Sequence, residues 1–270
     1  MGKAENISTD NKSRFNSFLQ ERMIARWAGL SLFPMIEYAL FPGGKRLRPL
    51  LTCAVATDLG LEVKEVLPGA AALECIHISS LIHDDLPCLD NDAVRRGMPS
   101  CHIAFGEASA LLAGDALIGW AFELIADVPR PNLAIFTLAE AFSELCLGQH
   151  QELIDSTQSA RIAELKTGAL FATALRLGGT SWSGDLELLG GLLRGIGRDF
   201  GVLFQLQDDY DDGDLQSATQ VSIAERFLNL QERFISLHEI TGSSFFQTKC
   251  LIKNALIRLL EREDHKSNLV

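Results

Sequence analysis

Two short segments of the chain concentrate aspartates. Residues 83–92 contain four of them, and residues 205–212 contain four more. In the first segment Pro87 cannot continue a helix, so it turns the chain and lets Asp90 return towards the aspartate pair that closes the preceding apolar helix. In the second segment, positions spaced by three and seven residues share one helical face. Each segment can therefore bring several carboxylates together.

Crowded carboxylates at the ends of two apolar helices repel one another unless a cation joins them. Oxygen ligands without histidine or cysteine favour Mg²⁺ over Zn²⁺. Either segment alone is also compatible with an ordinary solvated turn. Together, the two segments predict a magnesium site.

Basic residues that could hold phosphate lie near these aspartates in sequence. Arg95 and Arg96 follow the first segment, residues 43–49 combine a glycine turn with three bases, and Lys166 stands beside Thr167. Because Mg²⁺ held by few carboxylates keeps open positions for substrate phosphates, these bases predict a phosphorylated ligand. The sequence has no glycine loop of the Walker or dinucleotide-binding kind, which argues against a nucleotide as phosphate donor.

The composition predicts a folded protein whose excess charge is local. The 270 residues are 47% hydrophobic and carry a net charge of −11, but without the eight aspartates above the balance would be 27 acids to 24 bases. This net negative charge argues against nucleic acid or an anionic membrane as a partner.

The six cysteines form no C-x-x-C pair, no apolar leader opens the chain, and acids interrupt its longest apolar stretch, residues 108–128. We therefore expect a cytoplasmic protein without a transmembrane segment.

Apolar residues recur at helical spacing through almost the whole chain, and alternating β-type runs are nearly absent. This pattern predicts an all-α fold, and no linker divides residues 1–270, so we expect a single domain. Residues 70–82 and 190–206 are apolar on all sides, as in helices wrapped by others, and the glycines of the second favour close helix approach. Proline and glycine breakers predict helices at residues 12–30, 33–40, 49 onwards, 68–86, 108–126, 132–154, 160–177, 186–211, 221–240 and 245–262.

In order and spacing, these motifs resemble the trans-isoprenyl diphosphate synthases, the family of farnesyl and geranylgeranyl diphosphate synthases. The matching segments are residues 43–49, 76–97, 112–117, 148–149, 166–168 and 204–212. The resemblance implies a helical bundle of the isoprenoid synthase type with a central apolar cavity. It also implies a homodimer that pairs through helices in the middle of the chain, for which residues 108–128 are suited.

The resemblance implies a role for each matching residue. The ligands of three Mg²⁺ ions would be Asp84, Asp85, Asp90, Asp208, Asp209 and Asp212. The allylic diphosphate would bind to Arg95, Lys166, Thr167 and Gln205. Isopentenyl diphosphate would bind to Gly44, Lys45, Arg48, His77 and Arg96. The residues expected to carry the chemical step are Asp84, Asp85, Asp90, Asp208 and Lys166. Without the resemblance, a lone histidine such as His77 on an apolar helix would be interpreted as a core residue.

The implied reaction joins isopentenyl diphosphate to dimethylallyl, geranyl or farnesyl diphosphate. Cleavage of the allylic carbon–oxygen bond leaves a carbocation and a diphosphate whose new charge Mg²⁺ and the bases neutralise. The double bond of isopentenyl diphosphate attacks the cation. Proton loss, with the leaving diphosphate as base, completes farnesyl or geranylgeranyl diphosphate. An apolar cavity must keep water away from the cation.

Two serines on the helix before the first aspartate pair bear on product length. In the family, the residue five positions before the first aspartate, here Ser79, forms part of the cavity floor, and farnesyl synthases commonly carry Tyr or Phe there. Ser79 and its neighbour Ser80 leave the floor open, which favours a C20 over a C15 product. Three aromatic side chains could close the cavity instead, namely Phe105, Phe142 and Phe171.

The chain departs from the family after the second aspartate segment. The family usually carries lysines there that close over the allylic diphosphate, whereas residues 213–224 contain none. Arg226 could substitute, the closure could be absent, or turnover could be low. Two alternatives to an active synthase stay open. One is a weakly active or non-catalytic subunit that regulates a partner synthase, and the other is a terpene cyclase, which has no use for isopentenyl diphosphate bases.

Overall fold

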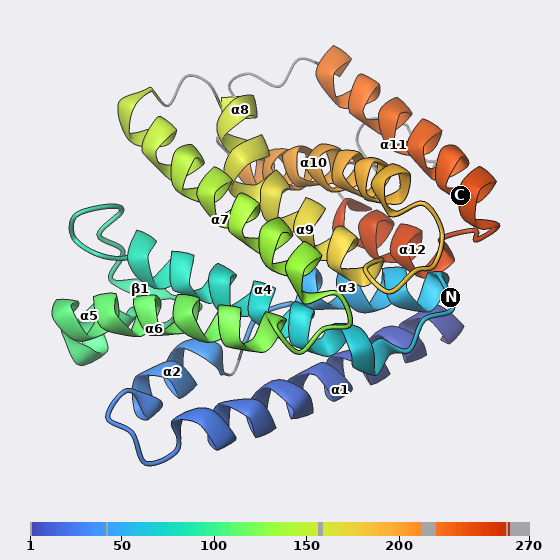
Figure 1. Ribbon diagram of the computed structural model, residues 1–270. Helices are drawn as coiled ribbons and strands as arrows, with labels where there is room; N and C mark the ends of the chain where they lie inside the picture. Colours follow the sequence, from blue (N-terminus) through green and yellow to red (C-terminus); the bar gives the residue numbers. More distant parts are fainter. Residues whose placement is uncertain (1, 42, 156–158, 212–219, 258, 260–270) are drawn as a thin grey trace.

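The protein is all-α apart from one short hairpin, within residues 2–41, 43–155, 159–211, 220–257 and 259, which the computed structural model describes. The first elements along the chain are α1 (Gly2–Trp27), α2 (Phe33–Leu40), α3 (Leu47–Asp58), α4 (Val63–Asp84), β1 (Val94–Arg95), β2 (Met98–Pro99), α5 (Cys101–Phe105) and α6 (Glu107–Ile125). The remaining elements are α7 (Pro131–Ile154), α8 (Ser159–Ala163), the π-helical turn η1 (Glu164–Gly168), α9 (Ala169–Gly178), α10 (Leu186–Asp211), α11 (Gln220–Thr241) and α12 (Phe246–Ala255). Figure 1 shows α3, α4 and α9 enclosed by the other helices, which confirms the expected helical fold.

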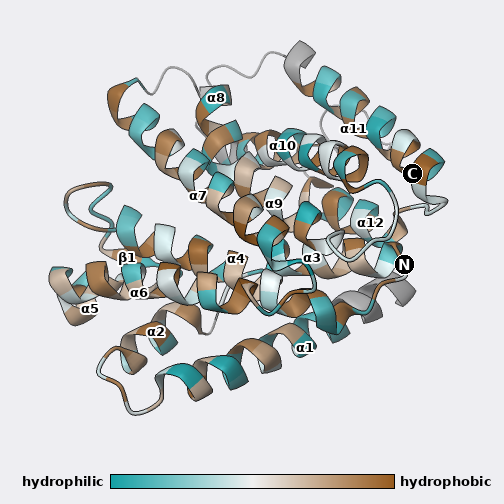
Figure 2. Ribbon diagram, in the orientation of Figure 1, coloured by the Kyte–Doolittle hydropathy of each residue, from teal (hydrophilic) through white to brown (hydrophobic). Residues whose placement is uncertain are grey.

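Helix α4 forms the middle of the core. It contacts α3, α6, α7 and α9, and most of its residues are buried, as the apolar segment 70–82 predicted. Helix α1 lies at the edge of the molecule and alternates between hydrophilic and hydrophobic residues in Figure 2. Its buried side chains, Phe15, Leu19, Met23 and Trp27, recur every four residues and therefore form one stripe that faces the core.

The expected start of α4 at Pro68 is wrong, because the helix begins at Val63. A proline in a helix interior costs about 3 kcal/mol. However, Val66 and Leu67 are buried in the turn that precedes it, and full burial of such a side chain contributes about 1.5–3 kcal/mol. Burial of this turn therefore outweighs the lost backbone hydrogen bond.

Most other boundaries follow the proline and glycine breakers. The predicted helices at residues 33–40 and 186–211 coincide with α2 and α10. Helix α1 begins at Gly2 rather than near residue 12, and the predicted end of the last helix at residue 262 lies outside the described residues. The hairpin, α5 and the π-helical turn within the predicted helix 160–177 were not expected.

Glycines on α10 permit a backbone contact on one side of that helix. A methyl group on Gly197 would lie 2.3 Å from the backbone of α9, and one on Gly201 would lie 2.4 Å from Gly168 in η1. This confirms close helix approach at these two positions. On the other side, a methyl group on Gly190 or Gly191 would have none of the described atoms within 4 Å.

Two helices, α4 and α6, are long and apolar enough to cross a membrane by length and composition alone. Helix α4 is a core helix, with 83% of its most apolar window buried, whereas α6 has 44% of its window buried and packs its inner side against α4. The expectation that acids exclude a span here was too strict for α6, because its window carries no more than two charged residues. The outer side of α6 exposes Leu111 and Leu112.

We expect Gly197→Ala to lower the free energy of unfolding by about 1–3 kcal/mol, because the added methyl group would push α10 away from α9. Gly191→Ala is the matched control on the same helix. There the methyl group meets open space, so the better helix propensity of alanine should raise stability by about 0.5–1 kcal/mol. Urea unfolding followed by circular dichroism measures both. Equal changes in the two variants would contradict the proposed contact.

Candidate active site

One cavity of about 730 Å³ lies between α3, α4, the hairpin, η1 and the carboxyl end of α10. Its lining residues come from segments that are far apart in the sequence. They are Gly43, Gly44, Lys45, Arg46, Leu47, Arg48, Glu74, His77, Leu81, Arg95, Arg96, Thr167, Phe171, Phe204, Gln205 and Asp208. Every residue expected to contact diphosphate lines this cavity, apart from Lys166.

Arg48 and His77 are neighbours in the cavity wall. Arg48 Nη1 lies 3.3 Å from His77 Nε2, and the guanidinium carbon lies 4.6 Å from the ring centroid of Phe171. Burial lowers the pKa of Arg48 to about 10, Glu74 opposes this shift and Arg96 adds to it. Burial, together with nearby arginines, also holds the pKa of His77 well below its usual value. His77 is therefore a neutral imidazole, and the poorly solvated Arg48 cation favours an anionic ligand.

The glycine turn before α3 makes room for two arginines. A methyl group on Gly43, whose φ is +74°, would lie 2.4 Å from the Arg46 guanidinium. One on Gly44 would lie 2.9 Å from the Arg96 guanidinium. The glycines therefore allow the arginines to lie directly against the backbone.

Of the three bases in this turn, Arg46 is held by the protein itself. Its Nη1 forms a buried ion pair with Glu74, and its Nη2 donates to the carbonyl of Leu40. Lys45, by contrast, is exposed at the cavity. The expectation that all three bases serve phosphate is therefore too broad, because a buried carboxylate from α4 already neutralises Arg46.

The β-hairpin presents Arg95 and Arg96 to the cavity. Its turn residues Arg96 and Gly97 both have positive φ, +55° and +77°, as a two-residue hairpin turn of this kind requires. Arg95 Nε donates to Asp85 at 2.9 Å, and its Nη2 contacts both Asp85 and Asp92. An ion pair therefore fastens the hairpin to the end of α4.

Asp84 and Asp90 come together as the proline turn predicts. The Asp90 N–H donates to the Asp84 carbonyl at 2.9 Å. Burial raises the pKa of Asp84 to about 6, Lys166 opposes the shift and the Asp90 carboxylate adds to it. Burial also raises the pKa of Asp90, Lys166 opposes this, and Glu152 adds to it. Both carboxylates thus lie where a divalent cation would favour their ionised form.

The expected meeting of three carboxylates at the first aspartate segment is not seen. Asp85 is buried and turned towards Arg95, which supplies a paired positive charge. Among the described residues, no three His, Cys, Asp or Glu side chains form a group that could hold a metal ion. Asp84 and Asp90 are the better candidates for oxygen ligands here, and ligation by Asp85 stays a prediction.

The π-helical turn η1 presents Lys166 and Thr167. Thr167 Oγ1 donates to Gln205 Oε1 at 3.1 Å, which joins the turn to α10 at the cavity. Lys166 pairs with Glu152 from α7, and its charge acts on both Asp84 and its partner Asp90. Lys166 therefore lies beside the first aspartate segment, although it does not line the cavity.

Two carboxylates at the site were missed by the sequence analysis. Glu74 is the one acid in the apolar segment 70–82, and a charge in such a helix needs a partner, which is the signal that could have identified it. Glu152 lies three residues after the matching segment 148–149, on the same side of α7 as that segment. Both residues hold bases of the site in place.

In the second aspartate segment, Asp208 lines the cavity together with Phe204 and Gln205. Its charge acts on buried Arg48, which places this end of α10 near the bases of α3. Asp212 lies outside the described residues, and so does the side chain of Asp209.

The residues expected to control product length lie at different places relative to the cavity. Ser79 is fully buried, and its hydroxyl has no hydrogen-bond partner among the described atoms, while Ser80 donates to the His77 carbonyl. Phe171 lines the cavity, whereas Phe105 packs edge-to-face on Tyr38 beside α2 and Phe142 packs against the core. Of the three aromatic candidates, Phe171 is thus the one in the cavity wall.

Arg226 is engaged with α10, which argues against its taking the place of the absent lysines. Its Nη1 lies 2.9 Å from Asp199, which also pairs with Arg233. Asp199 precedes Asp208 by nine residues, which is roughly 13 Å along a helix. Arg226 therefore joins α11 to α10 at a distance from the second aspartate segment.

Comparison with known proteins agrees with this geometry. Residues 31–221 match the polyprenyl synthetase family. The chain is 39% identical over 227 residues to a farnesyl diphosphate synthase of Haemophilus influenzae, across 77% of this chain and 75% of that protein. It is 40% identical over 249 residues to a geranylgeranyl diphosphate synthase of Cyanophora paradoxa, across 86% of this chain and 80% of that protein. A crystal structure of geranyltranstransferase from Thermotoga maritima superposes with a TM-score of 0.75 at 32% identity, covering 94% of this chain and 99% of that one.

The helical fold and its cavity define an isoprenoid synthase. The chain belongs to the polyprenyl synthetase family, whose members are generally metal-dependent, and it is a short-chain prenyltransferase.

We expect Arg226→Ala to lower the free energy of unfolding by about 1–3 kcal/mol, because buried Asp199 would keep Arg233 but lose one of its two charged hydrogen-bond partners. The KM for the allylic diphosphate should not change. Arg14→Ala, which breaks an exposed pair with Asp10, is the control and should cost no more than about 0.5 kcal/mol. Thermal unfolding and steady-state kinetics measure both effects. A raised KM for the allylic diphosphate at unchanged stability would show that Arg226 reaches the diphosphate instead.

Proposed function

We propose that the protein joins isopentenyl diphosphate to an allylic diphosphate, giving farnesyl or geranylgeranyl diphosphate and inorganic diphosphate. The observation that carries this proposal is that one cavity gathers enough groups for two diphosphates. Those proposed for isopentenyl diphosphate are Gly44, Lys45, Arg48, His77 and Arg96. Those proposed for the allylic diphosphate are Arg95, Thr167 and Gln205, with Lys166 beside them.

The proposed reaction moves three bonding electron pairs and one proton. The allylic carbon–oxygen bond breaks, and both of its electrons go to the diphosphate. The double bond of isopentenyl diphosphate supplies the pair for the new carbon–carbon bond, which leaves a second carbocation. An adjacent carbon–hydrogen bond then breaks, its electrons form the new double bond, and its proton passes to the released diphosphate. Because negative charge grows on the leaving diphosphate, Arg95 and Lys166 stabilise the transition state more than the bound substrate.

Asp84, Asp90 and Asp208 fit Mg²⁺ by the chemistry of their oxygen donors. Burial and neighbouring acids raise the pKa of Asp84 and of Asp90, so a bound cation would favour their ionised forms. Bound Mg²⁺ would neutralise diphosphate charge as a Lewis acid. The resemblance to the family supports three ions, and the proposed ligand set is completed by Asp85, Asp209 and Asp212.

Aromatic side chains support the exclusion of water from the reacting carbon. Phe171 and Phe204 line the cavity, with ring centroids 5.4 Å apart, and Phe200 packs behind them. Their apolar rings leave water little room beside a carbocation, and their faces carry partial negative charge that favours a cation.

The two alternative functions have weaker support. A regulatory subunit would typically have lost an aspartate motif, whereas every motif aspartate is present in this chain. A terpene cyclase binds one diphosphate and would have no use for Lys45, Arg48 and Arg96, which line the cavity together.

A homodimer in the cytoplasm completes the proposal. Leu111 and Leu112 on α6 are 46% and 57% exposed, an apolar surface that a second copy would cover. All six cysteines are free thiols, which fits a reducing compartment. Sedimentation as a species of twice 29.6 kDa would support the dimer, and a monomer at micromolar concentration would contradict it.

Condensation can be assayed with labelled isopentenyl diphosphate, Mg²⁺ and, separately, dimethylallyl, geranyl and farnesyl diphosphate, followed by chromatography of the dephosphorylated products. We expect geranylgeraniol, because the resemblance to the family places Ser79, a small residue, at the floor of the cavity. Farnesol as the only product would support the proposed prenyltransferase activity but would show that residues other than Ser79 form the cavity floor. No elongation by folded protein that binds Mg²⁺ and diphosphate would contradict the proposed function.

The same assay tests the floor with two variants. Ser79→Tyr should shorten the product to farnesyl diphosphate, since the ring would fill the space beside the prenyl chain. Ser79→Ala is the control and should leave product length unchanged, because it removes only a buried hydroxyl that bonds to none of the described atoms. An unchanged product from Ser79→Tyr would show that Ser79 does not face the growing chain.

A further inference from the structure

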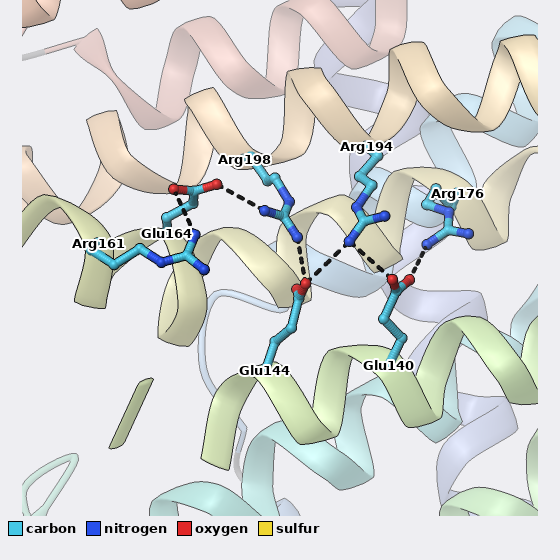
Figure 3. A network of polar contacts seen from close by, with 7 residues as sticks. All are labelled: Glu140, Glu144, Arg161, Glu164, Arg176, Arg194 and Arg198. Atoms are coloured by element: carbon cyan, nitrogen blue, oxygen red, sulfur yellow. Dashed lines mark hydrogen bonds and ion pairs between the residues drawn. The ribbon is translucent and has the colours of Figure 1, made fainter. Parts of the chain in front are cut away.

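An alternating chain of arginines and glutamates runs beside the site (Figure 3). It joins α7, α8, η1, α9 and α10, and every inner member pairs with two neighbours of opposite charge. In order, its members are Arg161, Glu164, Arg198, Glu144, Arg194, Glu140 and Arg176. None of them is among the described residues that line the cavity.

Arg198 is the member that contacts both ends of the π-helical turn. Its Nη1 lies 2.8 Å from Oε1 of Glu164, the first residue of η1. Its Cα and carbonyl oxygen lie 3.3 Å from the position that a methyl group on Gly168, the last residue of η1, would occupy. Its Nη2 pairs with Glu144 on α7. The side chain of Arg198 therefore connects η1 to α7, and its backbone, which is part of α10, packs against the end of η1.

The charges around Arg198 favour its ionised form and that of Glu164. Burial lowers the pKa of Arg198, but hydrogen bonds and charge from Glu164 and Glu144 outweigh burial, so the pKa is raised. Burial raises the pKa of Glu164, but the hydrogen bond from Arg198 and its charge outweigh burial and lower it. Both partners are thus held in their charged forms at neutral pH.

A π-helical turn has rarer and less regular hydrogen bonding than an α-helix, and it commonly occurs at functional sites. Such a turn needs support from the surrounding structure. We propose that Arg198 is a positioning residue, which holds η1 in its π-helical form and so places Lys166 and Thr167 against the diphosphate. The identity of that ligand rests on the proposed function, whereas the effect on the turn does not.

Arg176, at the far end of the same chain of charges, offers a matched control. It pairs with Glu140 at 2.9 Å and is 19% exposed, against 20% for Arg198, but it lies on α9 and bonds to no residue of η1 in the described structure. Arg198→Met and Arg176→Met each remove one charge from the network and keep the length of the side chain. Arg198→Met removes two ion pairs and Arg176→Met removes one, so Arg198→Met should lose more stability, and the control shows what loss of a network charge outside η1 does to the kinetics.

We expect Arg198→Met to reduce kcat/KM for the allylic diphosphate by roughly 10- to 100-fold, because a small displacement of a diphosphate contact has effects of this order. The KM for isopentenyl diphosphate should not change, since its proposed bases lie on α3, α4 and the hairpin. Arg176→Met should retain wild-type kinetics. The positioning role would be overturned if both variants kept the wild-type kcat/KM for the allylic diphosphate, or if both lost it to the same extent.

Hydrogen exchange of the full-length protein gives a readout that does not depend on activity. Amides of residues 159–178 should exchange faster in Arg198→Met than in Arg176→Met, with α4 unchanged in both. Unchanged exchange at η1 in folded Arg198→Met would overturn the inference, even if the wild-type enzyme proved inactive. If Arg198→Met does not fold, Arg198→Lys replaces it, since a single ammonium group cannot bridge both glutamates in the same way.

Discussion

The backbone contact between α10 and the segment from η1 to α9 determines how the site is assembled. It depends on Gly168, Gly197 and Gly201, where even a methyl group would collide with the facing backbone or be held tightly against it. Because α10 lies this close, Gln205 reaches Thr167, and the same helix continues to Asp208 in the cavity wall. Helix-to-helix distances of the ordinary kind would hold the second aspartate segment further from the bases of η1.

Charge pairs within the protein keep the site arranged before a ligand binds. Arg46, Arg95 and Lys166 each pair with a carboxylate from another element, so little reorganisation is needed when charge develops on a diphosphate. Arg48 and Asp84 differ from these, because burial shifts the pKa of each towards its neutral form. An anion beside Arg48 would raise its pKa again, and a cation beside Asp84 would lower its pKa again. A metal-bound diphosphate provides both charges.

Local features of the sequence were sufficient for most helices, whereas the set of residues around the cavity came from the resemblance to the family. Pro87 predicted the return of Asp90, and the breakers predicted α2 and α10. Features that depend on distant partners were not predictable from local pattern. Pro68 lies inside α4 because of burial, η1 is a π-helical turn in a segment that reads as a continuous α-helix, and Arg46 turns inward to a carboxylate 28 residues away.

Both aspartate segments are proposed to act on one diphosphate. Isothermal titration of inorganic diphosphate, with and without Mg²⁺, tests this claim most directly when it is repeated on Asp84→Asn and Asp208→Asn. Binding should require Mg²⁺, and each substitution alone should weaken it by at least about tenfold, which is 1.4 kcal/mol. Binding of wild-type strength in either folded variant would show that the two segments do not share a ligand, and would contradict the account.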